Sequence, residues 1–152
     1  MNRYLVLDLY NKKDAMFFGE KFLKDSTEWA KKITKHEEEL KDITELSAMT
    51  NSEVHSGNIG HPTEKTAFER MRIESSIHRY EVYQQIFNHG MAALDEEQKK
   101  IINSFFFTPG KYVHALVSSL ADELGCSLRG VYRKKDKAIL DFVAAVMEYI
   151  NY

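Results

Sequence analysis

Apolar side chains recur along the first third of the chain at intervals of four and three residues, not at alternating positions. The members of this series are Trp29, Ile33, Leu40 and Ile43, with His36 in register. Such spacing places side chains along one face of a helix. Asp25-Ser26-Thr27-Glu28 has the form of an N-terminal capping box. The sequence therefore predicts a helix that begins at this box and extends to about Met49.

A second series continues the same spacing through the middle of the chain. Its members are Ile73, Ile77, Tyr80, Phe87, Met91 and Leu94, with Gln84 in register. It predicts a helix from about Glu64 to Ala93 with Thr63 as its N-cap, and at 1.5 Å rise per residue this helix would be roughly 45 Å long. The segment Asn51–Pro62, which precedes it, is rich in turn residues and predicts a loop.

Two long helices joined by a loop predict an antiparallel hairpin. Pairing within the chain is the first expectation, because each helix must bury its apolar stripe. These apolar stripes also offer a surface for self-association, so we expect a homo-oligomer and favour a dimer. At the N-terminus, YLVLDLY fits either a short strand or a helical turn, and AMFFGEKFL fits a helix.

Three shorter helices are predicted in the last third of the chain. Asp95-Glu96-Glu97-Gln98 is a second capping box and begins a helix that extends to about Phe107. Thr108-Pro109-Gly110 ends this helix. The remaining elements are a helix over residues 112–124, a tight turn over 125–127 and a final helix from Leu128 to about Ile150.

Composition narrows the class of protein. The chain has 152 residues, with 43% hydrophobic and 29% charged, a balance typical of a globular protein of one domain or two small lobes. The single cysteine, Cys126, excludes a disulfide framework and favours a reducing cytoplasm. No apolar run approaches the ~20 residues of a membrane span, so we expect a cytoplasmic protein with no membrane partner.

We expect three segments in an all-α chain. Residues 1–63 contain the N-terminal segment, the first long helix and the loop, and residues 64–94 form the second long helix. Residues 95–152 form a C-terminal domain that carries most of the functional indications.

The charge distribution is informative although the net charge is only −2. Between residues 129 and 137, five Lys and Arg side chains accompany a single acidic one, Asp136. A basic stretch of this kind is often no more than a solvated helix face. It becomes a candidate for nucleic-acid binding where it coincides with a binding motif.

The stretch Leu116–Ala138 has the spacing of a helix-turn-helix. This motif requires a small residue within its first helix, a residue that tolerates a left-handed conformation at the turn, and an aliphatic residue on the inner face of the second helix. Ala121, Gly125 and Val131 occupy these places. Ser127 is positioned to cap the second helix, whose first residues would approach a major groove.

Arg129 and Arg133 lie one turn apart on the second helix, where arginine can read a guanine edge or clamp a phosphate. The other expected DNA contacts are Ser127, Leu128, Tyr132, Lys134, Lys135 and Lys137. Lys134 stands where many helix-turn-helix proteins have an aliphatic residue. We therefore expect the inner face to continue through the stem of Lys135 and through Ala138.

The segments LDEEQKKIINSFFF and LADELGCSLRGVYRKKDKAI resemble the C-terminal part of sigma-factor region 4. Small phage late-gene transcriptional regulators of the ArpU and RinA type share this pattern. In them an acidic L-D/S-E-E helix start precedes A-E-E-L-G-x-S-x-x-x-V-Y-R and a basic stretch with Ala. The matching positions are Leu94 to Glu97, Ala121 to Gly125, Ser127, Val131 to Arg133 and Ala138. The resemblance covers about residues 26–145 and is strongest over 94–140.

This resemblance implies a phage or prophage activator of late genes that binds double-stranded DNA and acts with the host RNA polymerase, in the cytoplasm of a bacterial cell. With the periodicity, it leads us to expect an all-α protein in which a long-helix hairpin precedes a helix-turn-helix bundle. The connector SFFFTPGKYVHALVSSLADEL is longer and more apolar than in that family, so the target sequence is not inherited from it.

Other classes of function remain as alternatives. None of the six histidines pairs with another at the spacing of a helical metal site, and no Gly-rich phosphate loop, nucleophile elbow or HExxH is present. We therefore expect no enzyme, no cofactor and no metal. A small terminase-type DNA-packaging subunit is one alternative, and a ring-shaped oligomer would favour it. A helical protein-interaction module is another, and it would show no salt-sensitive DNA affinity.

Overall fold

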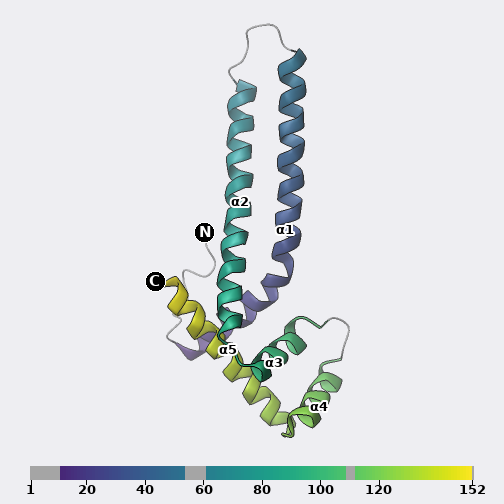
Figure 1. Ribbon diagram of the computed structural model, residues 1–152, viewed down its shortest axis with the longest axis vertical. Coiled ribbons are helices and arrows are strands. Elements are labelled where there is room, and N and C mark those ends of the chain that lie inside the picture. The colour runs from purple at the N-terminus through teal and green to yellow at the C-terminus, as the bar shows by residue number, and fades with distance from the viewer. Residues whose placement is uncertain (1–10, 54–60, 109–111, 152) are drawn as a thin grey trace. The chain divides into compact units, whose positions relative to one another are not determined.

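The computed structural model describes residues 11–53, 61–108 and 112–151, and every regular element in these ranges is a helix (Figure 1). The helices are α1 (Lys12–Glu53), α2 (His61–Ala92), α3 (Glu96–Phe106), α4 (Val113–Leu124) and α5 (Leu128–Ile150). The prediction of an all-α fold is confirmed for the described part of the chain.

The helices form two compact units that share α1 and α2. One unit contains the described residues up to Thr27 and those from Gln85 onward, and the other contains Glu28–Gln84. We call them the α5 unit and the hairpin unit. The expected boundaries after residues 63 and 94 do not coincide with this division, because α1 and α2 each contribute one end to the α5 unit.

Helix α1 begins at Lys12, well before the capping box that was predicted to begin it. The Ser26 hydroxyl donates to the Leu23 carbonyl at 2.6 Å, and the Thr27 hydroxyl donates to the Lys24 carbonyl at 2.9 Å. Both side chains therefore bond backward within a continuing helix and do not cap N–H groups ahead of them. The predicted start at Asp25 is wrong, because the chain before it already carries a buried apolar helix face that includes Phe18, Phe22 and Leu23.

The connection between the two long helices is shorter at both ends than the predicted loop. Helix α1 continues to Glu53 and α2 begins at His61, so Thr63 lies inside α2 and is not its N-cap. The rest of the predicted loop, residues 54–60, lies outside the described residues, and so do YLVLDLY and the Pro109-Gly110 stop.

In the hairpin unit, α1 and α2 run antiparallel. The rings of Trp29 and Tyr83 lie 5.5 Å apart, and those of His36 and Tyr80 lie 6.1 Å apart. Further along α1, the Arg70 guanidinium donates to the Thr44 hydroxyl at 2.7 Å. Burial raises the pKa of the Tyr83 phenol above its ordinary value. The two apolar series predicted from the sequence thus face each other over this length.

In the α5 unit, α5 is the element around which the others pack. Helices α3 and α4 both contact it and contact each other. The Gln98 amide of α3 donates to the Asp141 carboxylate of α5 at 2.6 Å, and Lys100 of α3 forms an ion pair with Glu123 of α4. The buried residues of α5 are Val131, Ala138, Ile139, Phe142, Val143, Ala145 and Val146.

Two glycines allow α1 and α2 to approach α5 closely. A Cβ atom added to Gly19 of α1 would lie 2.5 Å from Ile139 Cγ2, and one added to Gly90 of α2 would lie 2.5 Å from Phe142 Cε2. Phe142 and Ile139 are both fully buried. These contacts explain why a residue that weakens helices stands inside each of two long ones.

We expect Gly90→Ala to destabilise the protein. An Ala gains about 1 kcal/mol of helix propensity over Gly, but overpacking a filled core costs about 1–3 kcal/mol. Phe142→Leu removes the ring that the new Cβ would meet. The double variant should therefore be more stable than the two single effects predict, by at least about 0.5 kcal/mol. Urea unfolding of the four proteins measures this coupling, and additive effects would contradict the close contact.

Candidate nucleic-acid interface

The turn between α4 and α5 depends on one glycine. Gly125 has φ 65° and ψ 34°, the left-handed conformation that side chains with a Cβ disfavour. The backbone N–H of Cys126 donates to the Ala121 carbonyl at 3.0 Å, and the N–H of Gly125 donates to the same carbonyl. Two donors after the end of α4 thus satisfy the Ala121 carbonyl in its last turn. The sequence-based prediction of a tight turn at Gly125 is confirmed.

Helix α5 begins directly after this turn with a side-chain cap. The hydroxyl of Ser127 accepts the backbone N–H of Gly130 at 3.1 Å. Helix α3 has the capping box predicted for it, in which Asp95 accepts the N–H of Gln98 at 2.7 Å and the Gln98 side chain accepts the N–H of Asp95 at 3.2 Å. Both helix starts were therefore correctly predicted from local sequence.

A small apolar cluster holds α4 against the first turns of α5. Its buried members are Val117, Leu120, Ala121 and Val131, and Phe105, Leu116 and Cys126 pack against it. Val131 is completely buried, and Ala121 retains 7% of its surface. Ala121 and Val131 thus occupy the inner positions that the sequence spacing indicated.

The opposite face of the first turns of α5 is exposed. Arg129, Tyr132, Arg133, Asp136 and Lys137 follow one another at helical spacing on this face. Among the residues that the structure describes, no acidic side chain forms an ion pair with Arg129, Arg133 or Lys137. Three cations are thus available to an outside partner. We call this surface, including the adjacent Ser127 and Leu128, the basic face of α5.

Lys134 and Lys135 are engaged within the chain. Lys134 forms an ion pair with Glu97 of α3, and this hydrogen bond raises the pKa of its ammonium group. The ammonium of Lys135 lies 4.7 Å from the ring centre of Phe105 and 3.9 Å from the Glu20 carboxylate, with 19% of its side chain exposed. Together with the buried Ala138, it continues the inner face of α5 as expected from the sequence.

The two carboxylates that pair with these lysines were not indicated by any local sequence pattern. Glu97 lies in the capping box of α3, and Glu20 lies in the first half of α1, so both meet α5 only after folding. Of the predicted DNA contacts, the structure therefore brings Ser127, Leu128, Arg129, Tyr132, Arg133 and Lys137 to an exposed face. Lys134 and Lys135 have partners of their own.

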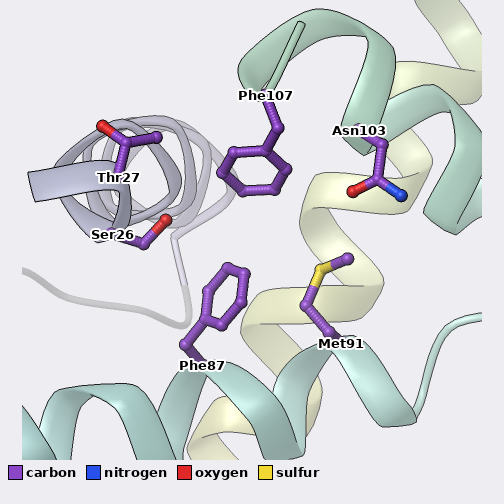
Figure 2. A pocket seen from close by; sticks show the side chains of 6 residues that line it. All are labelled: Ser26, Thr27, Phe87, Met91, Asn103 and Phe107. Carbon is purple, nitrogen blue, oxygen red and sulfur yellow. The ribbon is translucent and has the colours of Figure 1, made fainter. Parts of the chain in front are cut away.

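A hollow of about 380 Å³ also lies in the α5 unit (Figure 2). Its lining residues are Ser26, Thr27, Phe87, Met91, Asn103 and Phe107. The rings of Phe87 and Phe107 meet edge to face at 5.8 Å, and the two hydroxyls already donate to carbonyls of α1. None of the described residues that line the hollow is charged, so they offer no group for acid–base chemistry.

No three His, Cys, Asp or Glu side chains among the described residues gather closely enough to hold a metal ion. No helix in the described ranges is long and apolar enough to cross a lipid bilayer.

Comparison of the chain with models of protein families, with curated proteins and with solved structures finds no match.

Substitution of Gly125 tests the turn. Gly125→Ala should lower the free energy of unfolding by about 1–2 kcal/mol, because an L residue is strained in the left-handed region. Apart from Gly125 and its two chain neighbours, no atom of the described residues lies within 4 Å of the added Cβ, so this cost is conformational and not steric. Gly125→Asn should cost less, because Asn tolerates this conformation. Equal losses for Ala and Asn in urea unfolding would contradict this explanation.

Lys135, which packs within the chain, and Lys137, which is exposed, should contribute differently to the free energy of unfolding. We expect Lys135→Ala to lower the free energy of unfolding by about 1 kcal/mol, because it removes buried stem packing and a cation–π contact. Lys137→Ala, two positions away on the exposed face, should change it by less than about 0.5 kcal/mol. Thermal or urea unfolding measures both, and equal effects would show that Lys135 is not part of the packed inner face.

Proposed function

We propose that the protein binds double-stranded DNA in a sequence-specific manner, with α4 and α5 acting as a helix-turn-helix. The observation that carries the proposal is the division of α5 into two faces. Val131 on one face is buried against α4, while Arg129, Arg133 and Lys137 on the other have no acidic partner among the described residues. A recognition helix requires this combination of a fixed inner face and a free cationic outer face.

The proposed roles follow from the chemistry of each side chain. Arg129 and Arg133, one helical turn apart near the start of α5, are the candidates for bidentate readout of guanine O6 and N7. Lys137, farther along the same face, is a candidate for phosphate contact. Tyr132 keeps 44% of its surface while its ring packs 6.1 Å from that of Phe105, so its hydroxyl is presented in a defined direction.

We also propose a biological context for this DNA binding. The resemblance to phage late-gene regulators of the ArpU and RinA type supports a role as a phage- or prophage-encoded activator that acts with the host RNA polymerase in a bacterial cytoplasm. A hairpin that precedes a helix-turn-helix bundle is the arrangement expected for such a regulator. A dimer would present two copies of α5 to the two halves of a palindromic site.

The protein-interaction alternative has one supporting observation. Leu128 and Tyr132, on the basic face, keep 46% and 44% of their surfaces exposed, and exposed apolar side chains are also used in contacts between proteins. The two functions differ in their response to salt. DNA binding through free cations weakens steeply as salt increases, whereas a protein-interaction module would have no salt-sensitive DNA affinity.

We expect a binding selection from random duplex DNA to recover a symmetric or repeated motif with the wild-type protein. The double variant Arg129→Ala/Arg133→Ala should lose this enrichment, since each guanine contact contributes about 1–3 kcal/mol of discrimination. Lys13→Ala/Lys24→Ala, which removes the same charge from exposed positions of α1, is the matched control and should retain the motif.

Lys137→Ala should weaken binding to all sequences alike and reduce the slope of log K against log salt by about 1. Binding without enrichment would contradict the regulator and favour a packaging subunit. An absence of binding at low salt would contradict DNA recognition altogether.

A further inference from the structure

A second heptad series runs along α2, on the face opposite the one that contacts α1. Its members are Phe68, Met71, Ser75, His78 and Val82, spaced three, four, three and four residues apart. Phe68 keeps 71% of its surface exposed and Met71 keeps 62%. We call this series the outer seam of α2.

The outer seam is not part of the packing within the hairpin unit. At 100° per residue, it lies about half a turn around α2 from Ile73 and Ile77, which face α1. Ile73 retains only 2% of its surface, in contrast to Phe68 and Met71, which shortly precede it in the sequence. The half-buried Val82 extends the apolar character of the seam toward the end of this unit.

Helix α1 has no comparable outer face. At the equivalent spacing it carries only polar and charged residues, and all of them are exposed: Lys31, Thr34, Glu38, Lys41 and Glu45. Both helices have an exposed outer face, but only that of α2 carries large apolar side chains. Exposure to solvent alone therefore does not explain the composition of the outer seam. Large apolar side chains repeated along one exposed helix face are typical of a surface that another helix covers.

Charged residues flank the outer seam with opposite signs on its two sides. If Phe68 is assigned to position a of the heptad, Met71 falls at d, Arg72 and Arg79 fall at e, and Glu74 and Glu81 fall at g. All four flanking side chains are exposed.

This pattern discriminates between the two orientations of a helix pair. In a parallel pair, position g of one helix lies beside position e of the next heptad of the other, so Glu74 of each copy meets Arg79 of the other copy. An antiparallel pair of the same helices would place e beside e and g beside g, so that like charges meet.

We infer that the outer seam of α2 is a self-association surface that pairs with the same seam of a second copy in parallel orientation. The symmetric dimer contains two Glu74–Arg79 pairs, one on each side of the seam. Ser75 and His78 within the seam make it weaker than an all-apolar one, which suits a reversible dimer. The inference does not rest on DNA binding, because its surface lies in the hairpin unit and the basic face lies in the α5 unit.

The charge pattern supplies a decisive test in the full-length protein. Glu74→Arg and Arg79→Glu should each weaken self-association about tenfold or more, because each converts two attractive pairs into two repulsive ones. The double variant Glu74→Arg/Arg79→Glu should recover the wild-type affinity. An equimolar mixture of the two single variants should form a heterodimer more readily than either forms a homodimer. Sedimentation equilibrium measures all of these affinities.

The apolar positions and the orientation are tested separately. Phe68→Glu/Met71→Glu should abolish the dimer while leaving the helix content measured by circular dichroism unchanged, because both side chains are exposed. In a Cys126→Ser background, Met71→Cys should form a disulfide-linked dimer on mild oxidation, because equivalent d positions face each other in a parallel pair. Thr34→Cys on the outer face of α1 is the control and should not cross-link.

Several results would overturn the inference. A monomer at every accessible concentration would exclude this surface as a dimer interface, and so would an oligomer that Phe68→Glu/Met71→Glu leaves intact. Single charge reversals without effect, or a double reversal without rescue, would exclude the parallel arrangement.

The dimer is expected to be independent of DNA binding. Loss of DNA binding by Arg129→Ala/Arg133→Ala with the dimer retained would separate this proposal from the function proposed above.

Discussion

The close approach of Gly19 and Gly90 to α5 is the constraint on which the α5 unit depends. A methyl group at either position would lie 2.5 Å from a buried side chain of α5, so the backbones of α1 and α2 can pack there only because both residues lack a Cβ. The result is a helix enclosed along its second half by α1, α2 and α3. The cost in helix propensity is small compared with the burial of Ile139, Phe142 and Val146 that it permits.

This enclosure divides α5 into two parts with different roles. The second half is fixed in the core, whereas the first turns are covered on one face by the cluster around Val131 and are exposed on the other. Ser127 and Gly125 define where these first turns begin. A cationic surface on a rigid helix loses little conformational freedom when it binds a partner, which is why the basic face of α5 is the strongest candidate site. Lys134 and Lys135 belong to the support of this helix, through Glu97 and Glu20.

Helix α2, in the hairpin unit, also has two faces with different surroundings. One face pairs with α1 through Ile73 and Tyr80, and the other carries the exposed Phe68 and Met71. A two-helix hairpin has little interior of its own, and among its described residues only Trp29 and Ile73 are buried. Association of two hairpins would give these helices the larger apolar core that a pair alone cannot form.

The sequence by itself determined the features that depend on neighbouring residues. Helical periodicity predicted five helices, of which only the first begins far from its predicted start. The box at Asp95 and the cap at Ser127 marked two helix starts, and Gly125 marked the turn, because caps and turns are satisfied by atoms a few residues away. The capping box at Asp25 failed because the buried residues before it, Phe18 and Phe22, belong to the same helix and favour its continuation. Only the tertiary structure decided that both long helices contribute to two units, and that two of five clustered cations are neutralised. Those outcomes depend on contacts such as Glu20–Lys135 and Gly90–Phe142, between residues far apart in the chain, for which local pattern carries no information.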